Sequence, residues 1–138
     1  MNVIVSLDVG TKTIGIAVGS LQARLPRAHS TLGRKGVKQD VARLQRIASE
    51  LKADAVVVGL PYELDGSEGR SARLARQVGE ALADASGLPV HYQDERYSTL
   101  EAEDRLRQSG ISARDQRAII DQEAAAVILG DWFRQQAD

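Results

Sequence analysis

The segment LDVGTKTIGIAVG, residues 7–19, decides the fold of this chain. It joins two apolar runs, residues 2–8 and 14–18, through the turn-like residues 9–13. Two such runs with a short connection predict a β-hairpin. Asp8 ends the first predicted strand, and the nearby Gly10 lets a ligand or another backbone approach closely. Strand ends commonly hold ligands in α/β sheets, but an aspartate there often only hydrogen-bonds its own turn.

The rest of the sequence alternates between strand and helix patterns. After a weak strand around residues 28–32, apolar residues from Val37 onward recur on one helical stripe, with charges opposite. The further predicted elements are a strand at 55–59, a helix capped by Ser67 and ending near Ser86, a strand at 90–93, and helices at 99–108 and 113–135. These elements predict an α/β domain with a mixed five-stranded sheet flanked by helices.

Length and composition limit the classes of protein. The 138 residues suit one domain over 1–138, large enough for a core but too small for two lobes that close on a substrate. No signal peptide or membrane span is visible, so we expect a cytoplasmic protein. Because there is no cysteine, any metal must bind to oxygen or to His29 or His91, which favours a hard cation.

The net charge of -1 gives no overall attraction to nucleic acid, but one segment is strongly basic. Between Ser20 and Ser49 the acidic residue is Asp40 alone. The basic residues there are Arg24, Arg27, Arg34, Lys35, Lys38, Arg43 and Arg46. We expect this segment to form a phosphate-facing surface.

Asp121 is singled out by helical geometry. It shares the predicted core-facing stripe of the last helix with Ala125, Ile128 and Trp132, whereas Glu123 points the other way. An ionised carboxylate on such a stripe is costly unless it is paired, hydrogen-bonded or bound to a metal. A structural salt bridge, for example to Lys12 or an arginine, explains the position as well as a functional site does.

Asp94 and Glu95 come at the end of the strand predicted at 90–93. Neighbouring strand residues face opposite sides of a sheet, so only one of the two acids can share a cleft with Asp8. The pattern does not say which one. A surface ion pair with Arg96 is the simpler explanation of this acidic pair.

The loop at residues 59–69 leads into a helix whose Arg70, Arg73 and Arg76 are spaced three apart. Free amides at a helix start, next to arginines, suit a phosphodiester. The alternative is a glycine-rich turn followed by a solvated helix face.

Four segments together resemble the YqgF family, also called RuvX, of Holliday junction resolvase-like proteins and pre-16S rRNA nucleases. They are LDVGTKTIGIAVG at 7–19, VVGLPYELDGSEG at 57–69, QDERYST at 93–99 and DQEAAAVIL at 121–129. Four motifs in order are far more specific than any one alone. The resemblance implies a ribonuclease H-like fold whose catalytic and metal-binding acids are Asp8, Glu95 and Asp121. Thr13 departs from the family, which usually carries Arg or Lys there.

The implied activity is hydrolysis of phosphodiester bonds, either in pre-16S rRNA or in Holliday junctions. Three carboxylates in one cleft repel a phosphodiester unless a divalent cation is present. Two Mg²⁺ or Mn²⁺ ions about 4 Å apart would activate water and stabilise the leaving oxygen, with Asp8 bridging them. The residues expected to contact nucleic acid are Lys12, Arg70, Arg73, Arg96, Tyr62 and Tyr97, the tyrosines as base-stacking candidates.

Two other functions fit part of the sequence. Residues 8–13 also look like the first phosphate loop of actin-like ATPases and sugar kinases, but those proteins close two such domains around a nucleotide. A non-catalytic nucleic-acid binder or ribosome-assembly factor could keep the fold and use the acids structurally. The sequence leaves open whether the substrate is RNA or DNA, and whether the protein is a monomer or a homodimer.

Overall fold

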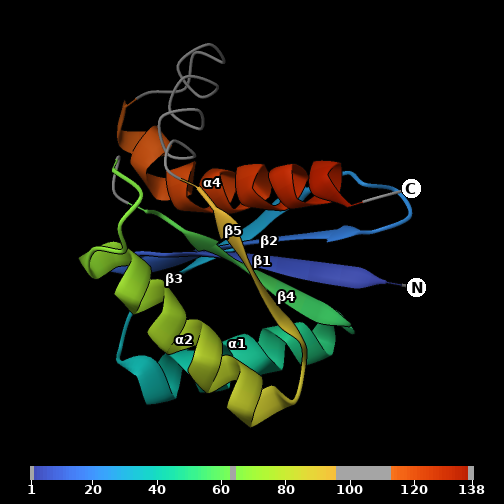
Figure 1. The fold of residues 1–138 in the computed structure, drawn as a ribbon, viewed down its shortest axis with the longest axis horizontal. Helices are drawn as coiled ribbons and strands as arrows, with labels where there is room; N and C mark the ends of the chain where they lie inside the picture. The colour runs from blue at the N-terminus through green and yellow to red at the C-terminus, as the bar shows by residue number, and fades with distance from the viewer. Residues whose placement is uncertain (1, 63–64, 96–112, 137–138) are drawn as a thin grey trace.

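The computed structural model describes residues 2–62, 65–95 and 113–136. Five strands form one sheet in the order β3-β2-β1-β4-β5 (Figure 1). The strands are β1 (Val3–Val9), β2 (Thr13–Ser20), β3 (Arg27–Gly33), β4 (Ala55–Leu60) and β5 (Val90–Asp94). The helices are α1 (Val37–Glu50), α2 (Arg70–Ser86) and α4 (Ala113–Gln135). The predicted mixed five-stranded sheet is therefore confirmed.

The sheet combines both strand directions. β1 pairs antiparallel with β2, and β2 pairs antiparallel with β3, which confirms the predicted hairpin. β4 pairs parallel with β1, and β5 pairs parallel with β4. The carboxyl ends of β1, β4 and β5 therefore lie at the same end of the sheet, where Asp8, Gly59 and Glu95 are found.

Helices cover both faces of the sheet, with α1 and α2 on one side and α4 on the other (Figure 1). Because side chains of a strand alternate between faces, β1 contributes to two cores. Val5, Leu7 and Val9 pack in the core beneath α1 and α2. Ile4 packs in the second core, beneath α4. Ser6 and Asp8 follow the same alternation as Ile4 and face α4.

The helix ends agree with the sequence pattern except at one cap. Gly87, in the left-handed conformation with φ 74°, ends α2 as predicted. The predicted cap Ser67 is wrong, since α2 begins at Arg70 with Gly69 as its N-cap and no side-chain cap. The amide and hydroxyl of Ser67 instead donate to Asp65 Oδ1, at 2.9 and 2.7 Å, and so form a local turn.

The last helix is confirmed at 113–135. Phe133, only 1% exposed, takes the buried aromatic position, whereas Trp132 on the predicted stripe is half-buried. The helix expected at 99–108 lies outside the described residues. Within the described parts of the chain, no helix is both long and apolar enough to cross a membrane.

Part of the expected basic surface is structural. Arg34 and Arg43 turn inward to the carboxylate of Asp40, which is fully buried on α1. Their side chains are 10% and 27% exposed. These two arginines are therefore not available as a phosphate-facing surface.

Candidate active site

Asp8 and Asp121 come together between the sheet and α4. Ser6, two residues before Asp8, donates its hydroxyl to the Ala125 carbonyl of α4 at 2.7 Å. This buried hydrogen bond fixes one turn of α4 directly over β1. Asp121 lies one helical turn before Ala125, so the helix brings its carboxylate toward the end of β1 where Asp8 stands.

Gly15 allows this close approach. It is the register partner of Asp8 across the β1–β2 pair. A Cβ at this position would lie 1.9 Å from the Asp121 carbonyl oxygen and 2.8 Å from the Gln122 nitrogen. Because those atoms are helix backbone, they could not move without displacing α4. A glycine is therefore required beneath Asp121, a role that the sequence pattern did not reveal.

The Asp121 carboxylate is held by a hydroxyl. Thr13 Oγ1, at the start of β2, donates to Asp121 Oδ2. Among the described residues no Lys, Arg or His forms an ion pair with Asp121, so the salt bridge to Lys12 considered from sequence is not found. Thr13 is thus the partner of Asp121 that the sequence reasoning missed.

Asp8 lies in an environment that disfavours its charge. Burial, followed by the negative charge of Asp121, raises the pKa of Asp8 from 3.8 to about 7. Within the described residues no cationic side chain forms an ion pair with Asp8. Perturbed carboxylates of this kind are more frequent at functional sites, so the Asp8–Asp121 pair is a candidate site.

Glu95, and not Asp94, faces α4. The parallel register pairs Gly59 with Gln93 and Leu60 with Asp94, so Glu95 shares the face of Gly59 and Gln93. Its amide continues the ladder by donating to the Leu60 carbonyl at 2.9 Å. The Glu95 side chain, 7% exposed with a buried Oε1, lies over Gly59. The alternative left open by the sequence is decided geometrically, because Asp94 points to the α2 side.

Gly59 provides the space that Glu95 uses. A Cβ on Gly59 would lie 3.6 Å from Glu95 Cγ and 2.5 Å from Ile128 Cδ1. Because Gly59 has no side chain, β4 leaves room for both Ile128 of α4 and Glu95, which follows β5. This second glycine, like Gly15, is recognised only when the tertiary contacts are known.

The three acids follow the order of the strands. Asp8 is on β1, Asp121 lies over Gly15 of β2 on one side, and Glu95 lies over Gly59 of β4 on the other. All the donors are carboxylate oxygens, which suit Mg²⁺ or Mn²⁺ rather than a softer metal. Among the residues that the structure describes, no three His, Asp or Glu side chains are close enough to enclose one ion. The three acids therefore lie side by side across neighbouring strands and do not surround a single point.

Candidate phosphate-binding side chains lie around this end of the sheet. Lys12 is exposed in the turn between β1 and β2. Arg70 and Arg73 are exposed on the first turn of α2 and line a surface groove with Arg76. Arg76 already has partners, since it forms a bidentate ion pair with Glu68 and lies 4.9 Å from the centroid of the Tyr92 ring.

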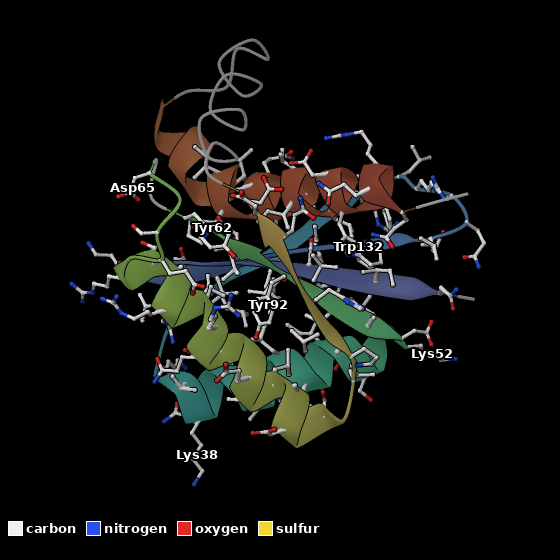
Figure 2. The ribbon with its side chains drawn as sticks, viewed as in Figure 1. Lys38, Lys52, Tyr62, Asp65, Tyr92 and Trp132 are labelled. Carbon is white, nitrogen blue, oxygen red and sulfur yellow. The ribbon has the colours of Figure 1, made fainter. Side chains whose placement is uncertain are left out.

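The loop after β4 carries the remaining candidates that can be placed. Tyr62 is half-buried and packs against the core beneath α1 and α2, so only part of its ring is accessible. Figure 2 shows Tyr62 just beyond β4 and Asp65 farther along the loop toward α2. Arg96 and Tyr97, also predicted to contact nucleic acid, lie outside the described residues.

The family model RuvX, described as Holliday junction resolvase, matches residues 2–135. The chain belongs to the RuvX family. A relative from Anaeromyxobacter dehalogenans (strain 2CP-C) is 47% identical over 131 residues, covering 95% of this chain and 96% of its own. One from Thermosynechococcus vestitus is 40% identical over 130 residues, covering 94% and 86%. Both relatives carry the name "Putative pre-16S rRNA nuclease". RuvX membership confirms the resemblance drawn from the four motifs.

Solved structures agree on the fold of this RuvX chain. RuvC of Thermus thermophilus superposes with a TM-score of 0.57 at 18% identity, covering 95% of this chain and 93% of RuvC. The fowlpox virus Holliday junction resolvase gives a TM-score of 0.58 at 13% identity, covering 97% and 99%. RuvC has a ribonuclease H-like resolvase fold, so the predicted fold class is confirmed.

Proposed function

We propose that this RuvX protein is a metal-dependent nuclease that hydrolyses phosphodiester bonds in structured nucleic acid, with residues 1–138 forming one nuclease domain. The observation that carries the proposal is the Asp8–Asp121 pair: burial and then the charge of Asp121 raise the pKa of Asp8, and neither carboxylate has a cationic partner among the described residues. Such a pair is costly in a purely structural role and suits a site that binds a cation.

The row of acids supports a site for two divalent ions. Asp8, Asp121 and Glu95 would hold the divalent ions through their carboxylate oxygens, with Asp8 as the central acid of the three. When bound, Mg²⁺ or Mn²⁺ lowers the pKa of an attacking water and stabilises the charge on the leaving oxygen. Thr13 keeps one oxygen of Asp121 occupied and so limits the orientations of that carboxylate.

The cationic side chains position the substrate in this proposal. Lys12, Arg70, Arg73 and Arg96 hold the phosphates on either side of the scissile bond, and Tyr62 and Tyr97 stack on bases. Phosphate contacts place the strand, while the acids supply the metal site. The names of the curated relatives favour pre-16S rRNA as substrate, and the family description favours a four-way DNA junction.

A side-by-side cleavage assay tests the proposal and separates the substrates. The two substrates are a flanked precursor of small-subunit rRNA and a four-way DNA junction, each with Mg²⁺ or Mn²⁺. We expect metal-dependent cleavage of one substrate, lost in Glu95→Gln and retained in the matched control Asp94→Asn, whose side chain points away from the site. Equal loss in both variants, or cleavage that persists in Asp8→Asn, would contradict the assigned site.

The cellular setting follows from the substrate. A protein that processes rRNA would act in the cytoplasm and could do so as a monomer, whereas symmetric cleavage of a four-way junction calls for a homodimer with two sites. Sedimentation with each substrate distinguishes these two states.

The non-catalytic alternative makes a different prediction for metal. A nucleic-acid binder that uses the acids only structurally shows the same response to Mn²⁺ in the wild type and in Asp8→Asn. The ATPase alternative requires stabilisation by ATP, which a thermal unfolding series measures.

A further inference from the structure

A buried ion network lies at the start of α1, on the opposite face of the sheet from α4. Asp40 is fully buried and accepts three hydrogen bonds. Arg34 Nε donates to its Oδ2 at 3.0 Å, while the Lys35 amide and Arg43 donate to its Oδ1 at 2.9 and 2.6 Å. The carboxylate therefore fixes the loop between β3 and α1.

Arg34 extends this network to the turn between β1 and β2. Its guanidinium also donates to the Gly10 carbonyl at 3.2 Å, and its backbone amide donates to the Lys12 carbonyl at 2.8 Å. The turn is closed by the Gly10 amide, which donates to the Thr13 carbonyl at 2.8 Å. Thr13 then donates its hydroxyl to Asp121. A continuous chain of contacts thus leads from Asp40 to an acid of the candidate site.

The geometry requires an arginine at position 34. The planar guanidinium directs one nitrogen to Asp40 and another to the Gly10 carbonyl at the same time. A lysine has a single nitrogen on a flexible stem and cannot reproduce this fixed fork. Arg43 offers the natural comparison, since it pairs with the same carboxylate but also donates to the Gly33 carbonyl, at 2.6 Å, instead of to Gly10.

We propose that Arg34, held by Asp40, is a positioning residue that fixes the 10–13 turn and, through it, the placement of Lys12 and Thr13 beside the acids. This inference rests on the proposed nuclease function. A buried ion pair is weak support for stability alone, and fixing one local arrangement is its best-attested use. The hydrogen bonds of Arg34 go to Asp40, Gly10 and Lys12, so Arg34 acts on the acids through the turn.

The test compares Arg34→Met with Arg43→Met. Each variant removes one arginine from Asp40, but only the first removes the contact with Gly10. In the metal-free protein, amide hydrogen exchange of Gly10 is expected to accelerate in Arg34→Met and to remain near wild type in Arg43→Met. Nuclease assays are expected to show a fall in kcat of about 10- to 100-fold for Arg34→Met, because displaced groups near a reacting centre cost that much.

Arg34→Lys provides a second variant if Arg34→Met does not fold. It keeps the charge beside Asp40 but not the two-directional fork, so faster Gly10 exchange and a reduced kcat are again expected. If the wild type cleaves and the Arg34 variants match Arg43→Met in both exchange and kcat, the positioning role is overturned. If the wild type cleaves neither substrate, the proposed function fails and this inference fails with it.

Discussion

Two aspartates in this protein, the fully buried Asp40 and the partly exposed Asp8, have surroundings that shift their pKa values in opposite directions. Burial alone would raise the pKa of Asp40, but hydrogen bonds from the Lys35 amide, Arg34 and Arg43 outweigh it and hold the pKa below its ordinary value. Burial, followed by the charge of Asp121, raises the pKa of Asp8 to about 7. Two arginines of the chain neutralise the first carboxylate, whereas the second has no ion pair with a cationic side chain among the described residues.

The difference distinguishes a structural carboxylate on α1 from the candidate metal ligand on β1. Asp40 holds the β3–α1 loop and is complete without a ligand. Asp8 lies between Asp121, which is over Gly15, and Glu95, which is over Gly59. The charged form of Asp8 becomes favourable when a cation is supplied. Removing the charge at Asp40 should therefore lower the stability of the protein. Removing it at Asp8 should raise the stability of the metal-free protein and abolish cleavage.

The largest expected effect is the loss of cleavage activity in the variant Asp8→Asn. Losing the central ligand of a metal site removes several kcal/mol of transition-state stabilisation, so we expect at least about a thousand-fold loss of kcat/KM. Single-turnover cleavage with Mn²⁺ measures it. Activity within tenfold of wild type in a preparation free of other nucleases would break the distinction between the two aspartates.

Asp40→Asn should produce the largest loss of stability. The substitution keeps the shape but leaves Arg34 largely buried without its counter-charge, which costs about 3 kcal/mol or more. Urea unfolding at pH 7 measures the loss. Asp8→Asn in the presence of EDTA serves as the opposite case, since removing one of two repelling charges should stabilise the protein. A loss of stability in both variants would contradict the comparison.

Gly15→Ala should be the next most damaging substitution, at about 1–3 kcal/mol, because the new methyl group meets the backbone of α4. Gly33→Ala is the matched control, since a Cβ there meets nothing within 4 Å. Thermal unfolding of the two variants provides the measurement. Equal midpoints would mean that α4 does not rest on Gly15 as the structure has it.

The smallest effect is expected from an exposed arginine. Arg73→Ala should weaken nucleic-acid binding by less than about tenfold and reduce the slope of log K against log salt by about one, as for one lost phosphate contact. Binding of a non-cleaved substrate in Ca²⁺ at several salt concentrations measures the slope. An unchanged slope would remove Arg73 from the proposed contact surface.

Much of the fold could be predicted because its signals are local. The two apolar runs at residues 2–8 and 14–18 and the turn between them were enough for the hairpin, and the helical stripe was enough to single out Asp121. The choice between Asp94 and Glu95 depended on the register of β5 against β4, which no local pattern encodes. Thr13 and Gly59 could not be recognised from sequence, because their partners Asp121 and Ile128 are far along the chain. Ser67 was misassigned because α2 begins only at Arg70, with Gly69 as its N-cap, and Ser67 instead donates to Asp65 in a local turn.

The raised pKa of Asp8 also fixes the sign of a pH effect. Between its ordinary value of 3.8 and about 7, the folded protein binds more protons at Asp8 than the unfolded chain does. Stability of the metal-free protein therefore falls as pH rises through this window, and the loss is complete above pH 7. A cation bound beside Asp8 should reverse this loss of stability, because it favours the charged carboxylate.

The most direct test of the central claim is the free energy of unfolding as a function of Mn²⁺ concentration at pH 8, in the wild type and in Asp8→Asn. The account predicts that wild-type stability rises with the logarithm of Mn²⁺ concentration once the site begins to fill, and that the rise is absent in Asp8→Asn. An equal rise in both proteins, or none in the wild type, would show that Asp8 is not the centre of a metal site.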